Sequence, residues 1–251
     1  MDLVIYTALG VGLATVVGAG IGFIFKNISH RTQDGILGFA SGVMLAAAII
    51  SLILPSTEIG GKYGIIITIL GIFIGAVFLN LIDKLVPHLH KLADNALIDD
   101  TERKNKLNKI LLFVLAIAIH NFPEGIAAGV GAGSGNVANA ITIALGIAIQ
   151  NIPEGMVIIA PMIASGISKK RTFIIACSTG VIEVIGTFIG YFSTAISTAI
   201  LPFALAFAGG TMLYVISNEM IPETHSHGNE RFATYSLLVG FALMLVLNVI
   251  I

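Results

Sequence analysis

Charged residues are scarce in this chain: Asp, Glu, Lys and Arg make up 11% of its 251 residues, while 56% are hydrophobic. A soluble domain is roughly one quarter charged, so a chain this apolar has too little polar surface to face water on all sides. The single cysteine, Cys177, excludes a disulfide framework within the chain. Tryptophan is absent, so an interfacial belt would lack its usual Trp component. The few basic residues border apolar runs, which argues against nucleic-acid binding. The composition predicts that lipid is the main solvent.

Long apolar runs divide the chain. A membrane-spanning helix needs about 20 mostly apolar residues, and we find eight such runs. They are Leu3–Phe25, Gly35–Leu54, Gly64–Leu85, Lys109–Val130, Val137–Ala160, Thr172–Ile196, Phe203–Ile221 and Thr234–Ile251. The first run has no basic segment before it and exceeds the length of a signal peptide core, so we interpret it as a retained span. The runs do not alternate as barrel strands would. We expect an all-α polytopic bundle, one transmembrane domain over 1–251, with a polar cytoplasmic loop at about 86–108.

The distribution of Lys and Arg predicts the orientation. If the N-terminus lies outside, every Lys and Arg except Lys62 falls in a loop on the inner side. This asymmetry follows the positive-inside rule and places both termini outside the cytoplasm. The sequence shows no targeting or luminal domain, so we expect a bacterial plasma membrane.

A short motif occurs twice. The chain reads A-I-H-N-F-P-E-G over residues 118–125 and A-I-Q-N-I-P-E-G over residues 148–155. The two copies fall on consecutive predicted spans, which run in opposite directions. Inverted repeats with broken helices near the membrane midplane are typical of transporters, and we expect inverted pseudo-symmetry in the bundle.

Few ionisable residues fall within the predicted spans. They are His120, Glu124, Glu154 and Glu183, with Glu219 near the inner end of the seventh span, and no Lys or Arg accompanies them. A buried carboxylate costs several kcal/mol unless it is paired or coordinated. These acids are therefore protonated, face water, or await a mobile cation. Each option indicates an ion or proton path.

The repeat predicts two facing sets of ligands. His120 and Glu124 are four residues apart and share a helix face, and Gln150 and Glu154 repeat that spacing. Each pair encloses a proline that kinks the helix and an asparagine whose amide can turn inward. A glycine follows each glutamate, where we expect it to leave space beside the carboxylate. These residues are Asn121, Pro123 and Gly125 in the first copy and Asn151, Pro153 and Gly155 in the second.

Imidazole together with carboxylates suits Zn²⁺, Fe²⁺, Co²⁺, Mn²⁺ or the softer Cd²⁺ better than Mg²⁺ or Ca²⁺, which prefer oxygen alone. Copper(I) would want more sulfur than Met44 offers. We therefore expect transported zinc or iron(II) first and no prosthetic group. The predicted metal ligands are His120, Asn121, Glu124, Gln150, Asn151, Glu154, Glu183 and Met44.

Other polar residues have two readings each. Glu183 is a further ligand or an acid hydrogen-bonded to a nearby Ser or Thr. Met44 shares a face with Ser51, although core packing is the commoner role of such a methionine. Candidate pathway residues are Ser51, Glu58, Glu219, His88, His90, His225 and His227. For the acids and histidines among them, the alternative is an ordinary solvated or loop residue.

The paired motif resembles that of the ZIP family (Zrt/Irt-like metal importers), in its bacterial zinc-uptake and GufA-like form. The resemblance covers nearly the whole chain. It implies that transport runs toward the cytoplasm, that homodimers are frequent, and that Met44 and Ser51 lie on the pathway. The ligands that it implies for a divalent ion near mid-membrane are His120, Asn121, Glu124, Gln150, Asn151, Glu154 and Glu183. Some relatives have an acid at the position of Asn151, so we expect one firm site and one weaker site.

Two other functions fit parts of the pattern. A proton- or sodium-coupled antiporter would use the same acids but needs no histidine beside them. An intramembrane metalloprotease would need H-E-x-x-H or a similar motif, and the chain has no H-E pair. We therefore expect a transporter and not an enzyme, with metal ions and lipid as its partners.

Overall fold

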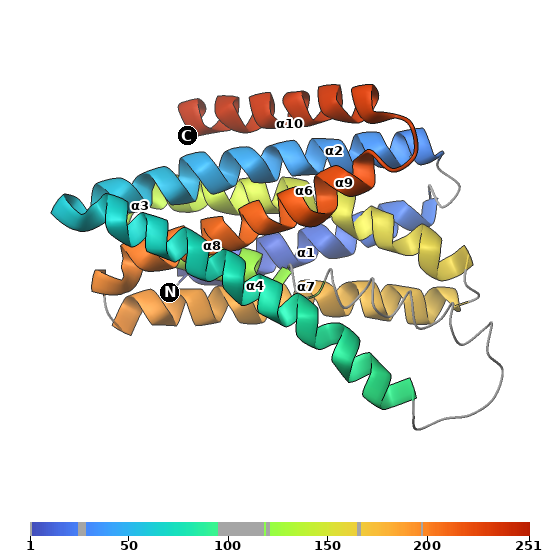
Figure 1. The fold of residues 1–251 in the computed structure, drawn as a ribbon, viewed down its shortest axis with the longest axis horizontal. Helices are drawn as coiled ribbons and strands as arrows, with labels where there is room; N and C mark the ends of the chain where they lie inside the picture. The colour runs from blue at the N-terminus through green and yellow to red at the C-terminus, as the bar shows by residue number, and fades with distance from the viewer. Residues whose placement is uncertain (1, 25–28, 95–117, 119–120, 165–166, 197) are drawn as a thin grey trace.

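The computed structural model describes residues 2–24, 29–94, 118, 121–164, 167–196 and 198–251. Over these residues the secondary structure is entirely helical. The long helices lie side by side along one axis of the molecule (Figure 1). The predicted all-α bundle is confirmed.

The labelled helices follow the apolar runs. They are α1 (Asp2–Ile24), α2 (His30–Ala46), η1 (Ala47–Ile53), α3 (Leu54–Ile59), η2 (Gly61–Tyr63), α4 (Gly64–Asp94), α6 (Val137–Ala164), α7 (Lys169–Ile196), η3 (Thr198–Ile200), α8 (Leu201–Val215), η4 (Ile216–Met220), α9 (Ile221–Thr224) and α10 (Glu230–Ile250). Residues 121–133 are also helical. Seven described helical stretches are long and apolar enough to cross a membrane. Half of the fourth predicted span, Lys109–Val130, lies outside the described residues.

Two helix boundaries differ from the prediction. The second helix begins at His30 rather than Gly35, because the Ser29 hydroxyl accepts a hydrogen bond from the Thr32 amide and caps its first turn. Within the predicted polar loop at 86–108, residues 86–94 are helical and continue α4. Leu, Lys and Ala favour helix in water as well as in lipid, so loss of hydropathy ends the membrane span without ending the helix. Residues 95–108 lie outside the described residues.

The helices form two groups. In the first group α1 packs against α6 and α7, and the helical segment 121–133 crosses α7. In the second group α2 packs against α10, and α4 against α8. The groups meet where α6 contacts α2 and η1. We call this contact the seam.

Glycines allow the helix backbones of each group to approach closely. A Cβ at Gly155 would collide with the carbonyl oxygen of Thr15 on α1, and a Cβ at Gly125 would collide with that of Glu183 on α7. In the second group Gly42 of α2 packs in the same way on the backbone of α10. The prediction that Gly125 and Gly155 leave space beside the glutamates is therefore wrong. Neighbouring backbone fills that space.

Two π-helical segments interrupt the helices of the second group. Segment η1 ends two residues before Pro55, and η4 ends two residues before Pro222. A proline ring removes one helical hydrogen bond and clashes with the carbonyl four residues earlier, and one widened turn relieves both problems. At Pro55 that carbonyl belongs to Ser51, which accepts a hydrogen bond from Asn139 Nδ2 at 3.4 Å across the seam. Pro55 thus opens the helix backbone beside the first group.

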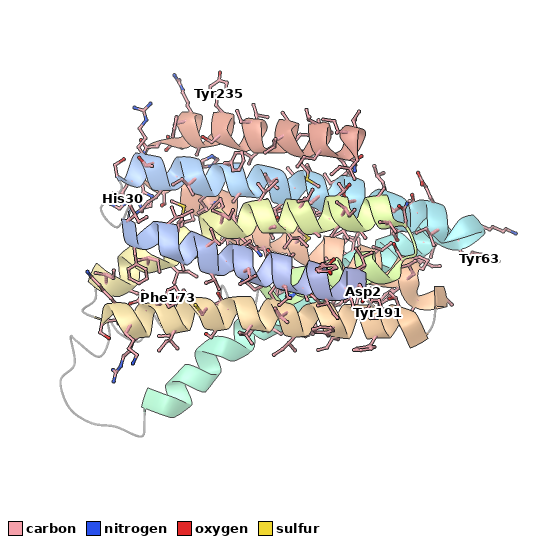
Figure 2. The ribbon with its side chains drawn as sticks, turned by 180° about the vertical axis from the view of Figure 1, so that it is seen from behind. Asp2, His30, Tyr63, Phe173, Tyr191 and Tyr235 are labelled. Atoms are coloured by element: carbon pink, nitrogen blue, oxygen red, sulfur yellow. The ribbon has the colours of Figure 1, made fainter. Side chains whose placement is uncertain are left out.

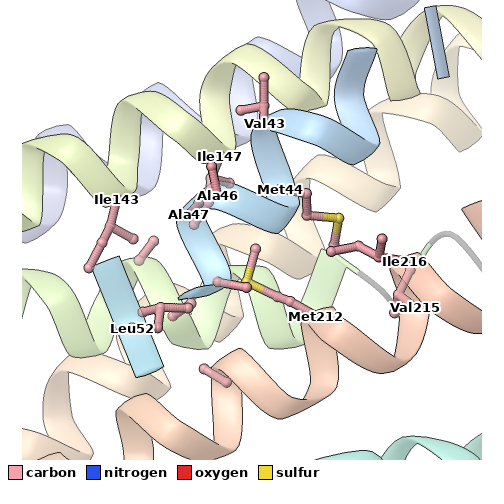
Figure 3. Close-up of a cluster of buried hydrophobic side chains, with 14 of the residues drawn as sticks. Val43, Met44, Ala46, Ala47, Leu52, Ile143, Ile147, Met212, Val215 and Ile216 are labelled. Carbon is pink, nitrogen blue, oxygen red and sulfur yellow. The ribbon is translucent and has the colours of Figure 1, made fainter. Parts of the chain in front are cut away.

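The seam is apolar along much of its length. Met44 of α2, Ile147 of α6 and Met212 of α8 are buried in one cluster (Figure 3). Flexible methionines fill irregular gaps, which suits a contact between two groups of helices.

The polar ends of the bundle are well separated. His30 and Phe173 lie at one end, and Asp2, Tyr63 and Tyr191 lie at the other (Figure 2). The start of α1 and the end of α10 therefore share one end of the molecule (Figure 1).

Candidate metal centre

Three carboxylates from three helical segments converge in the first group. Glu124 of segment 121–133, Glu154 of α6 and Glu183 of α7 lie close enough for their charges to interact. Glu124 and Glu183 are buried and Glu154 is half-buried. None of the buried polar side chains in the described residues belongs to Lys or Arg. The cluster therefore concentrates negative charge without a fixed cation.

Several buried polar atoms in this cluster have no hydrogen-bond partner among the described residues. They are both carboxylate oxygens of Glu124, both amide atoms of Asn121 and of Gln150, and Oδ1 of Asn151. Gln150 lies beside Glu124 but outside hydrogen-bonding geometry. A buried polar atom without a partner costs about 1–3 kcal/mol. A bound cation would satisfy the oxygens among these atoms at once.

Asn151 and Glu183 are tied to α1. Asn151 Nδ2 donates to a carboxylate oxygen of Glu183 and, at 3.1 Å, to the carbonyl oxygen of Val11. The hydroxyl of Thr15 donates to the second carboxylate oxygen of Glu183 at 3.3 Å. A hydrogen bond from a nearby Ser or Thr is one of the two roles that the sequence predicts for Glu183.

The donor set of the cluster is mixed. In the described part of the chain, no three His, Cys, Asp or Glu side chains are placed to hold one metal ion. The oxygens brought together are carboxylates from the glutamates and amides from Asn121, Gln150 and Asn151. His120, the predicted imidazole ligand, lies outside the described residues.

Comparison with known proteins identifies the family. The family model for ZIP zinc transporters matches residues 93–248. Zinc transporter GufA of Myxococcus xanthus is 39% identical over 94% of both chains. Zinc transporter ZupT of Chlorobaculum parvum is 36% identical over 94% of this chain and 92% of its own length. Zinc transporter ZIPB of Bordetella bronchiseptica is 35% identical over 94% of this chain and 77% of its own.

The chain belongs to the ZIP family. It is therefore a membrane transporter and not an enzyme, as the sequence predicted.

The second group of this ZIP protein carries four more of the residues predicted from the sequence. Met44 is buried among apolar side chains of the seam. Ser51 is buried in η1, and its hydroxyl has no hydrogen-bond partner. Glu58 is exposed in α3, while Glu219 is half-buried in η4. Ser51 and Glu219 thus both lie in the widened turns before prolines.

The histidines predicted for the inner loops differ from one another. His225 is exposed. His227 lies 3.0 Å through Nδ1 from Oδ1 of the buried Asp34, and Asn229 Nδ2 donates to Oδ2 of Asp34 at 2.9 Å. His30 stacks on His227 with ring centroids 4.5 Å apart. His88 and His90 fall within α4, but their side chains lie outside the described residues.

Two residues of the carboxylate cluster and of the His227 contact were not predicted from the sequence. Asp34 directly precedes the predicted second span, whereas in the structure it is buried within α2. Thr15 lies in an apolar helix far from both motif copies, and a lone hydroxyl in a span carries no spacing signal. Its role becomes visible only when α1 packs between α6 and α7.

Proposed function

We propose that this ZIP protein transports zinc toward the cytoplasm, with iron(II), manganese, cobalt and cadmium as secondary substrates. The relatives named zinc transporters support zinc as the first substrate. The mixture of carboxylate and amide oxygens with the imidazole of His120 supports a transition metal over magnesium.

One observation carries this proposal: buried oxygens without partners surround Glu124 and Glu154. Two carboxylates balance the charge of one divalent ion. The ion in turn supplies the interaction that Asn121, Gln150 and Asn151 lack within the protein. We therefore assign these five residues and His120 to the binding site, with Glu183 beside them.

The path would cross the seam. An ion would enter past the exposed Glu58, reach the site near Met44 and Ser51, and leave past Glu219 and the histidines of the inner end. The first group of helices would move against the second along the apolar seam. The flexible side chains of the methionines and the widened turns η1 and η4 would tolerate such a displacement.

The orientation, membrane and assembly of the transporter are proposed from the sequence. The basic loops favour an orientation with both termini extracytoplasmic. We propose the bacterial plasma membrane as its location and a homodimer as its assembly.

Zinc flux into proteoliposomes containing the purified chain tests this function. We expect saturable zinc uptake that iron(II) inhibits and magnesium does not, and that the double variant His120→Ala, Glu154→Ala abolishes. Glu230→Ala, which removes an exposed acid at the start of α10, should transport normally. A proton or sodium current without zinc flux would instead assign the same acids to an antiporter.

A further inference from the structure

The amide of Asn151 is held in one orientation. Its Nδ2 group donates to the Val11 carbonyl oxygen at 3.1 Å and to Glu183. A backbone carbonyl only accepts hydrogen bonds, so the NH₂ side of the planar amide must face α1. Oδ1 then lies on the other side of the amide, buried and without a partner in the described structure. Asn151 thus has an anchored nitrogen and an unsatisfied oxygen.

Glu183 is the centre of this anchor. One of its carboxylate oxygens accepts from Asn151 and the other from Thr15 Oγ1 at 3.3 Å. Both oxygens therefore have a donor, in contrast to Glu124, whose oxygens have none. Glu183 is also fully buried. These contacts suit an acid that orients a neighbour better than one that waits for an ion.

Close backbone packing fixes the hydroxyl of Thr15. A Cβ at Gly155 would collide with the Thr15 carbonyl oxygen, and a Cβ at Gly180 would lie 3.5 Å from the Thr15 Cβ. Thr15 is thus wedged between α6 and α7, and its side chain is fully buried. A rigid donor at this point restricts where the carboxylate of Glu183 can lie.

We propose that Thr15 and Glu183 are positioning residues that hold the Asn151 amide so that Oδ1 faces the transported divalent cation. The proposal rests on the proposed function. Residues that orient a metal ligand typically change metal affinity by about 10- to 100-fold when they are replaced. The anchor also leaves Glu124 and Glu154 as the acids available to one divalent ion.

Variants of Thr15 test the proposal. Thr15→Val keeps the shape and removes the hydroxyl, whereas Thr15→Ser keeps the hydroxyl. We expect Thr15→Val to weaken zinc binding to the purified full chain by roughly 10- to 100-fold and Thr15→Ser to restore most of the affinity. Thr211→Val is the matched control, because Thr211 is buried on α8 and its hydroxyl bonds only within its own helix, to Ala208. Zinc affinity is measured by calorimetry on the monodisperse fraction, so that a loss of folded protein does not affect the measured affinity.

The visible absorption spectrum of bound cobalt(II) separates positioning from structure. If Thr15 orients a ligand, the cobalt bands shift in Thr15→Val and return in Thr15→Ser. A purely structural threonine would leave the spectrum of the bound ion unchanged in every variant, which would overturn the proposal.

Glu183 distinguishes positioning from direct ligation. In Glu183→Gln the amide oxygen can still accept from Asn151 and the amide nitrogen can bond to Thr15, whereas Glu183→Ala breaks both contacts. We expect Glu183→Gln to bind zinc clearly more tightly than Glu183→Ala. Equal losses in the two variants would show that the charge matters and that Glu183 is itself a ligand. Absence of zinc binding and zinc flux in the unaltered protein would instead refute the proposed function.

Discussion

Glu124 shows the conflict between stability and binding at the scale of a single residue. Its carboxylate is buried, lies near two other acids, and has no hydrogen-bond partner in the part of the chain that the structure describes. Such an arrangement costs folding free energy. It is retained, in our account, because the transported cation pairs with it.

Glu124→Gln should therefore separate the two effects. Glutamine has nearly the same shape and brings no charge, so we expect an unfolding temperature equal to or above that of the unaltered protein. Zinc affinity should fall by more than the roughly 10- to 100-fold that loss of an outer contact costs. Thermal unfolding and calorimetry on the same sample check both parts. Lower stability with normal affinity would contradict this role of Glu124.

The two inner histidines should behave differently when they are removed. His227→Ala leaves the buried Asp34 with one donor fewer, so we expect a loss of about 1–3 kcal/mol in the free energy of unfolding. His225→Ala, which removes an exposed ring, should change stability by less than about 0.5 kcal/mol. Chemical unfolding in detergent measures both. Equal effects would contradict a structural role for the pair of His227 and Asp34.

The sequence could predict the acids of the centre but not their anchors. The repeated motif fixes the spacing of Glu124, Gln150 and Glu154 on two helices, and spacing within one helix can be read directly. Thr15 and Asp34 act through contacts with other helices, and such contacts follow from packing rather than from spacing.

At the scale of helices, crossings depend on positions without a side chain. Gly18 and Gly155 bring α1 and α6 together so closely that a Cβ at either position would collide with the backbone of the other helix. The same crossing holds Thr15 against Glu183. Helix packing and the geometry of the centre are therefore coupled.

Gly155→Ala tests this coupling. The added methyl group would meet backbone, which moves less readily than a side chain, so we expect a destabilisation of about 1–3 kcal/mol and weaker zinc binding. Gly10→Ala is the matched control on α1, because nothing lies within 4 Å of its added Cβ. Unfolding and zinc affinity are measured for both variants. If Gly155→Ala resembled Gly10→Ala, the close crossing would not be important.

Helix boundaries were less predictable than helix number. Hydropathy locates the membrane spans but not the ends of the helices. Helix α4 continues beyond its apolar part to Asp94, and α2 begins at His30, before its apolar part. The π-helical turns were not predicted at all. Pro55 and Pro222 mark them in the sequence, yet a proline alone does not tell a kink from a widened turn.

For the whole molecule, the basic loops predict the orientation. In a background where Cys177 is replaced by serine, Lys62→Cys should react with a membrane-impermeant maleimide on intact cells. Ser226→Cys, at the opposite end, should react only after permeabilisation. Lys62 and Ser226 are both exposed, so the side of the membrane and not burial decides the result. The reverse pattern would invert the orientation and with it the proposed direction of transport.

The arrangement of the two helix groups gives the molecule a polar centre beside an apolar seam. Glu124 and Glu154 belong to the first group, whereas Met44 and Ser51 are buried in the second. Relative movement of the groups would therefore alter access to the centre while its ligands stay together.

X-ray absorption spectroscopy of the zinc-bound protein tests the central claim most directly, because it reports the atoms around the ion. We expect nitrogen and oxygen neighbours at about 2.0–2.2 Å with an imidazole contribution that disappears in His120→Ala. Glu154→Ala should reduce the oxygen shell. An imidazole signal that persists in His120→Ala, and disappears instead when His225 and His227 are replaced, would place the bound zinc at the inner loops and contradict a centre built on the repeated motif.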